Sequence, residues 1–201
     1  MSPTEARDRA NLVAARDPAA AREMALAIKD PWFRCQALAA SARYADESKV
    51  EQVAEESLMA AAECHDNYKQ AAVAAWPIRA LVERGRAALA WDALGRARER
   101  ALAATPPSSR AEALLALLQG GWDLGASTRR QLVEDLAALH ATDTFWRVGR
   151  ALVNALEMLS KEDRDLARAI AERIADDRCR AKALAGIQTE RACGPRKYFG
   201  P

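Results

Sequence analysis

The chain has 201 residues, of which 50% are hydrophobic and 29% are charged. This composition excludes an intrinsically disordered protein, and the length suffices for one well-buried domain or a small array of repeats. The formal net charge is only +2, which is less than the concentrated basic excess of most dedicated nucleic-acid binders. No apolar run approaches the ~20 residues of a membrane span, and the first residues lack the apolar core of a signal peptide. We therefore expect a cytoplasmic protein without a membrane partner.

Helix-start signals divide the chain into eleven predicted helices. Ser2, Pro3 and Glu5 provide an N-cap, a proline at the first helical position and the acidic member of a capping box. The remaining N-cap candidates are short polar residues before apolar runs: Asp17, Asp30, Ser48, Asp66, Thr105, Ser127, Asp143 (or Thr142), Ser160 and Asp176. The predicted helices lie near 3–16, 18–29, 31–44, 48–64, 67–84, 86–104, 107–119, 128–141, 144–159, 161–175 and 177–190. No segment alternates polar and apolar residues for long enough to predict a strand.

A short pattern recurs five times along these helices. An alanine is followed five residues later by a polar anchor or a proline, and four residues beyond the anchor usually stands an arginine. The five copies are Ala25–Asp30–Arg34, Ala61–Asp66–Gln70, Ala101–Pro106–Arg110, Ala138–Asp143–Arg147 and Ala171–Asp176–Arg180. A period of this size is typical of stacked two-helix repeats. The pattern predicts an all-α fold: a right-handed α-α superhelix (solenoid) of about five helical hairpins with one leading helix.

The repeats predict the domain organisation. We expect one helical-repeat domain over 1–193, followed by an irregular basic tail over 194–201 that also carries two aromatic residues. Within the domain, the repeats lie near 17–45, 46–84, 85–120, 127–159 and 160–190. Small residues flank each predicted turn, which lets the two helices of a hairpin approach closely.

The motif Ile-x-Asp-x-x-x-Arg-x-x-Ala-Leu occurs at 28–38 and again at 174–184. With this motif and the repeat period, nearly the whole chain resembles the tetratricopeptide and HEAT-type helical-repeat proteins. The resemblance is one of architecture, because the Trp, Leu-Gly and Tyr signature of the tetratricopeptide repeat is absent. Such families mostly act as scaffolds for peptides or proteins. The resemblance therefore implies a binding role, without assigning individual site residues.

Arginines at the repeat period are the first candidate site. Arg34, Arg110, Arg147 and Arg180 occupy equivalent positions in four units, and Gln70 occupies the fifth. Stacked in a row, they would form a groove for carboxylates or phosphates, since arginine offers a bidentate fork. The alternative is a structural tie between each arginine and an aspartate at a helix cap.

Aromatic residues are the second candidate site. Trp91, Trp122 and Trp146 are the tryptophans that we expect to contact a partner. The alternative is that aromatics at the repeat period act as wedges between alanine-rich units. Trp122 lies in the glycine-rich segment 119–127, where it either contacts a partner or packs as a lid on the adjacent helices.

No catalytic constellation is present in the sequence. His65 and His140 have no Cys or Glu at zinc-ligand spacing, and neither a nucleophile elbow nor a phosphate-binding glycine loop occurs. The four cysteines contain no Cys-x-x-Cys pair, and we expect Cys35, Cys64, Cys179 and Cys193 to be small apolar residues in a reducing compartment. We predict no enzyme activity, no cofactor and no metal.

Three functions remain open. The favoured one is a non-enzymatic protein- or peptide-binding scaffold. The alternative is a nucleic-acid-binding module or a HEAT-like DNA-repair glycosylase. Glycosylases of that type bind DNA through a basic face. The support for this alternative is the arginine cluster around Trp91, namely Arg84, Arg86, Arg96, Arg98 and Arg100. A second alternative is a structural module that forms homo-oligomers through the apolar ends of the array.

Overall fold

The computed structural model describes residues 1–189, 196, 198 and 199. These residues form eleven α-helices and one short 3-10 turn, without any strand, so the prediction of an all-α fold is confirmed. The elements are α1 (Pro3–Ala14), α2 (Pro18–Leu26), α3 (Pro31–Tyr44), α4 (Val50–Ala62), α5 (Asn67–Glu83), α6 (Ala87–Ala103), α7 (Pro107–Gly120), η1 (Trp122–Leu124), α8 (Ala126–Thr142), α9 (Trp146–Leu159), α10 (Arg164–Glu172) and α11 (Asp177–Gln188). No helix in this described part has the length and apolar character needed to cross a membrane.

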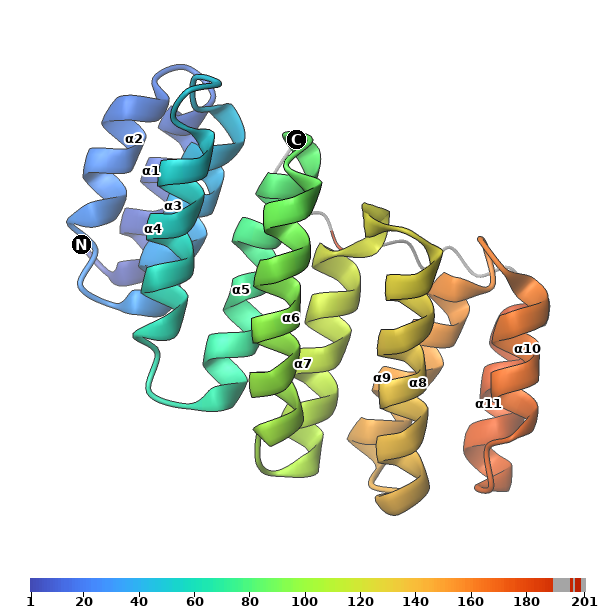
Figure 1. Cartoon of the computed structure of the whole chain (residues 1–201). Coiled ribbons are helices and arrows are strands. Elements are labelled where there is room, and N and C mark those ends of the chain that lie inside the picture. Colours follow the sequence, from blue (N-terminus) through green and yellow to red (C-terminus); the bar gives the residue numbers. More distant parts are fainter. Residues whose placement is uncertain (190–195, 197, 200–201) are drawn as a thin grey trace.

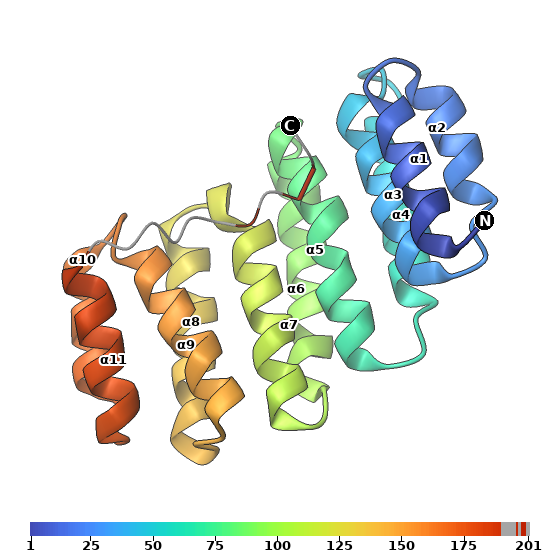
Figure 2. The same cartoon turned by 180° about the vertical axis from the view of Figure 1, so that it is seen from behind.

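The helices are arranged in two layers. Figure 1 faces the even-numbered helices and Figure 2, from behind, faces the odd-numbered helices. Each odd-numbered helix from α1 to α9 packs against the next odd-numbered one, whereas the even-numbered helices pack mainly on their odd-numbered neighbours. We call the two faces the odd layer and the even layer. The odd layer is therefore closely packed, and the even layer leaves gaps between its helices.

Most predicted helix starts are confirmed. An N-cap involves only residues that are close together in sequence, so the sequence alone indicates it. Ser2 and Glu5 form the expected capping box, and the carboxylates of Asp17, Asp30, Asp66 and Asp176 accept hydrogen bonds from the first turns of their helices.

Other predicted caps are wrong. Ser48, Thr105 and Ser127 do not cap helices: α4, α7 and α8 begin without a side-chain cap, and α8 follows Gly125, whose φ of 115° suits glycine. Ser160 closes the end of α9 instead, because its hydroxyl donates to the carbonyl of Glu157 at 2.9 Å. Asp163 caps α10 in its place.

The alanines of the repeat pattern lie in the core in four of the five units. Ala25, Ala61, Ala101 and Ala171 are at most 1% exposed. Ala138 is exposed, because the fourth unit has a different register. Asp143 accepts a hydrogen bond from the amide of Phe145, but α9 begins only at Trp146. The small-residue contact is thus interrupted in the fourth hairpin.

A proline inside α5 is compensated by a side chain from α3. Pro77 lacks an amide hydrogen, so the carbonyl of Val73, four residues earlier, loses its helical partner. The thiol of Cys35 donates to that carbonyl at 3.5 Å, and the hydroxyl of Ser57 donates to the Cys35 carbonyl at 2.8 Å. Burial raises the pKa of the Cys35 thiol to about 12, so the thiol remains a proton donor at neutral pH. These contacts join α3, α4 and α5.

Candidate functional site

The arginines of the repeat pattern are mostly committed to the backbone. In four units the side chain at this position donates to a carbonyl six residues earlier, at the end of the preceding helix. The pairs are Arg34–Ile28 at 3.0 Å, Gln70–Cys64 at 2.7 Å, Arg110–Ala104 at 3.3 Å and Arg180–Ile174 at 2.7 Å. Helix ends leave such carbonyls without intrahelical partners, so the recurring side chain closes each turn. The tie is structural, but its recurring partner is a carbonyl rather than the expected capping aspartate.

Two of these arginines also form ion pairs with carboxylates. Arg34 also pairs with Glu63, and Arg180 pairs with Asp177. The row of arginines is therefore not an open cationic groove.

Arg147 differs from its equivalents. It is exposed, and its guanidinium lies 5.3 Å from the ring of Trp146. Trp146 is 58% exposed and Phe145 is 49% exposed. The guanidinium of Arg150 also lies near the Trp146 ring, 5.2 Å from its centroid. An exposed cluster of two aromatic rings and two guanidinium groups thus marks the start of α9.

The two other candidate tryptophans have opposite environments. Trp91 is 43% exposed on α6, whereas Trp122 is only 6% exposed. The guanidinium of Arg129 lies 5.2 Å from the Trp122 ring and donates to its carbonyl at 2.9 Å. Of the two interpretations of Trp122, the burial favours packing against neighbouring helices over contact with a partner.

The arginine cluster around Trp91 is largely neutralised. Arg84 and Arg86 both pair with Glu47, at 2.8 and 2.6 Å. Their hydrogen bonds hold the pKa of Glu47 below its usual range. Arg98 pairs with Asp135 at 2.6 Å. The local charge available to a phosphate backbone is correspondingly reduced.

The odd layer carries a site that the sequence did not indicate. Two aromatic residues from the carboxyl-terminal segment, Tyr198 and Phe199, lie against Trp76 of α5. The ring centroids are 5.2 and 5.6 Å from that of Trp76, with interplanar angles of 88° and 78°. Such edge-to-face contacts are favourable because the positive edge of one ring meets the negative face of another.

Tyr198 is held by its hydroxyl as well as by its ring. The side chain is buried, and the hydroxyl donates to the carbonyl of Ala116 in α7 at 2.7 Å. Burial raises the pKa of Tyr198 above its usual value, so the phenol stays protonated and can donate. The guanidinium of Arg196 lies 5.7 Å from the ring centroids of both Trp76 and Tyr198.

A chain of ion pairs borders this site. Arg43 pairs with Glu83 at 2.6 Å, Glu83 with Arg79 at 2.7 Å, and Arg79 with Asp123 at 2.5 Å. Arg43 also places its guanidinium 5.1 Å from the ring of Phe199. We call the surface formed by Arg43, Trp76, Arg79, Glu83 and Ala116 the aromatic groove; it spans α3, α5 and α7 of the odd layer.

The aromatic groove offers recognition chemistry. It provides an aromatic ring, a guanidinium group for stacking and a backbone carbonyl as acceptor. Within the described residues, no group of three or more His, Cys, Asp or Glu side chains is arranged to hold a metal ion. Cys35, Cys64 and Cys179 are buried free thiols, and Cys193 lies outside the described residues.

The chain was compared with known proteins. No protein-family model matches it, and neither a curated protein nor a solved structure does.

Proposed function

We propose that this protein is a non-enzymatic, peptide-binding helical-repeat scaffold whose binding surface is the aromatic groove. In this proposal the hairpins form a right-handed superhelix with the closely packed odd layer on its inner side. Such a surface would accept an extended segment that crosses several hairpins, as concave faces of repeat proteins do.

The observation that carries the proposal is the position of Tyr198. This residue belongs to the opposite end of the chain from α3 and α5, yet its ring is 6% exposed and its hydroxyl bonds to Ala116. Burying a large aromatic ring contributes ~1.5–3 kcal/mol, and its edge-to-face contact adds ~0.5–1.5 kcal/mol. The aromatic groove thus already holds an aromatic side chain from a segment distant in sequence.

The tail also suggests what a partner would present. Arg196, Tyr198 and Phe199 place a cation two residues before an aromatic pair. A partner peptide with the same arrangement would make the same contacts and would displace the tail. We therefore expect the partner to carry a Tyr-Phe or similar pair preceded by a basic residue.

Binding is tested with the full-length chain carrying Tyr198→Ala and Phe199→Ala, which vacates the groove. This variant should bind a fluorescent peptide of residues 194–201, measured by anisotropy, at least tenfold more tightly than the parent chain does. Adding Trp76→Ala to it should abolish the binding, because the ring that both aromatic side chains contact is removed.

Trp91→Ala is the matched control, since it removes a tryptophan from the even layer. Circular dichroism of each variant separates loss of binding from loss of fold. The proposal fails if the peptide binds the Trp76→Ala variant as well as the Trp91→Ala variant, or if it binds neither of them.

A further inference from the structure

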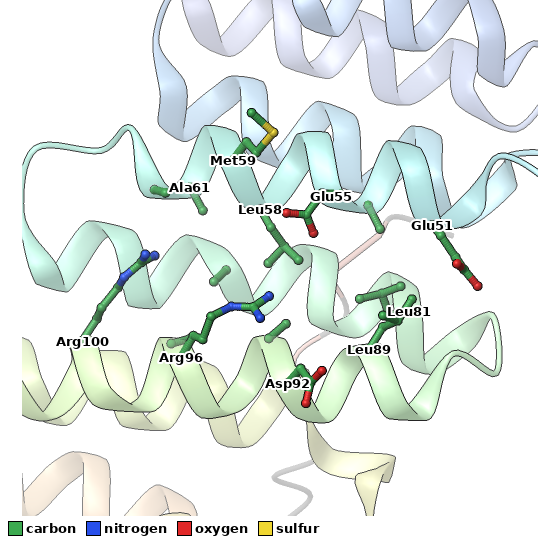
Figure 3. Close-up of a pocket in the computed structure, with 15 residues that line it drawn as sticks. Glu51, Glu55, Leu58, Met59, Ala61, Leu81, Leu89, Asp92, Arg96 and Arg100 are labelled. Atoms are coloured by element: carbon green, nitrogen blue, oxygen red, sulfur yellow. The ribbon is translucent and has the colours of Figure 1, made fainter.

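The geometry points to a second interaction surface, the groove between α4 and α6 in the even layer, and we propose that it takes an amphipathic helix of a partner protein. Figure 3 shows this groove, which is lined by residues of α4 and α6 above a floor supplied partly by α5. It belongs to the opposite layer from the aromatic groove.

The middle of the gap between α4 and α6 lacks the kind of bridge that spans two other gaps of the even layer. Arg22 of α2 forms two hydrogen bonds with Glu56 of α4, at 2.7 and 2.6 Å. Arg98 of α6 binds Asp135 of α8 in the same bidentate way, at 2.6 and 2.8 Å. Among the described residues, one ion pair reaches α4 from this side: Arg86, which lies just before the first residue of α6, binds Glu51 at 3.1 Å.

Charged residues that line the middle of this groove have no ion-pair partner among the described residues. They are Glu55 on α4 and Asp92, Arg96 and Arg100 on α6. In Figure 3 the side chain of Arg96 reaches from α6 toward Glu55 and Leu58. These four charges are available to a partner.

Apolar and small residues form the remaining lining. Leu58 of α4 and Leu89 of α6 supply the larger apolar surfaces, and Leu89 is 39% exposed, whereas Leu81 of α5 is buried beneath them in the floor. Between them lie alanines, which allow another helix to approach closely: Ala54, Ala61, Ala74, Ala93 and Ala97. An apolar stripe at helical spacing fits such a lining.

The charges set a direction for that helix. Because α4, α5 and α6 are consecutive antiparallel helices, α4 and α6 run parallel. Glu51 and Asp92 lie toward the beginnings of these two helices, and Arg100 lies toward the end of α6 (Figure 3). A helix favours acidic residues in its first turn and basic residues in its last turn. Such a helix therefore matches the groove when its amino-terminal end lies at Arg96 and Arg100, antiparallel to α4 and α6.

The test is selection from a displayed library of amphipathic helices against the full-length chain. The library has a fixed apolar stripe and randomised charges in the first and last turns. We expect enrichment of helices with acidic first turns and basic last turns. Helices selected in this way should bind the Arg96→Glu, Arg100→Glu variant at least tenfold more weakly, and should bind the Trp76→Ala variant unchanged.

Arg130→Glu is the control variant, because it reverses an exposed arginine on α8, outside this groove. The proposal is overturned if no charge pattern is enriched, or if the selected helices bind the Arg96→Glu, Arg100→Glu variant as tightly as the control. Loss of binding in the Trp76→Ala variant would also contradict it, since the helices would then occupy the odd layer.

Discussion

Replacing Gly120 by alanine tests the close approach of α5 and α7 on which the odd layer depends. A Cβ atom at Gly120 would lie 2.6 Å from the carbonyl oxygen of Ala75 and 3.0 Å from its Cα. Both atoms belong to the backbone of a buried helix, so no side-chain rotation can relieve the contact. Gly95 offers the opposite case, because a Cβ atom there meets nothing within 4 Å.

The two substitutions should therefore change stability in opposite directions. Over-packing at a helix contact costs ~1–3 kcal/mol, so Gly120→Ala should lower the free energy of unfolding by about that amount. Gly95→Ala removes a glycine from an exposed helical position, which should raise the free energy of unfolding by ~0.5–1 kcal/mol. For a chain of this size, each kcal/mol corresponds to roughly 2–4 °C in Tm.

Thermal and urea unfolding followed by far-ultraviolet circular dichroism measure both variants against the parent chain. If Gly120→Ala were as stable as Gly95→Ala, the two helices could not be as close at this point as the structure places them. A loss of stability in Gly95→Ala would instead refute the reasoning about exposed helical positions.

Two further predictions concern side chains that support the array. Arg180→Ala should lower the free energy of unfolding by ~1 kcal/mol, because the carbonyl of Ile174 loses its donor. Arg147→Ala should leave the free energy of unfolding unchanged, because Arg147 lies over the Trp146 ring. Equal losses of stability in urea unfolding would contradict the different roles of these two arginines. Hydrogen bonding from Arg22 holds the pKa of Glu56 below its usual range, so the pair stabilises the fold above the unfolded-state pKa of about 4.3 and loses this effect as pH falls through the lower folded-state pKa. Glu56→Gln should therefore cost ~1 kcal/mol at neutral pH and progressively less in acid, as measured by urea unfolding at several pH values; a cost that does not change with pH would contradict this role of the pair.

The helices could be predicted because their signals are local. The carboxylates of Asp30, Asp66 and Asp176 bond to amides within three residues, so the sequence neighbourhood contains the whole interaction. The caps predicted at Ser48, Thr105 and Ser127 do not form. The cap predicted at Ser160 was wrong because a local contact competes: its hydroxyl bonds backward to Glu157 instead of forward into α10.

The sites depended more strongly on tertiary contacts. The recurrence of Arg34, Arg110 and Arg180 was evident from the sequence, but their binding of the carbonyls that end the preceding helices was not. Likewise, the sequence left open whether Trp122 contacts a partner or packs as a lid on the adjacent helices, and the structure buries its ring. In both cases, the tertiary arrangement of the helices determines which groups the side chain contacts.

By itself, the sequence determined the all-α class and the recurring alanine contacts, since helix propensity, caps and periodic small residues act over one or two turns. Only the tertiary structure decided that Tyr198 and Phe199 meet Trp76, and that no ion pair crosses the middle of the gap between α4 and α6. The physical reason is distance along the chain. Tyr198 and Ala116 are 82 residues apart, and no local preference encodes a hydrogen bond between residues that only the packing of hairpins brings together.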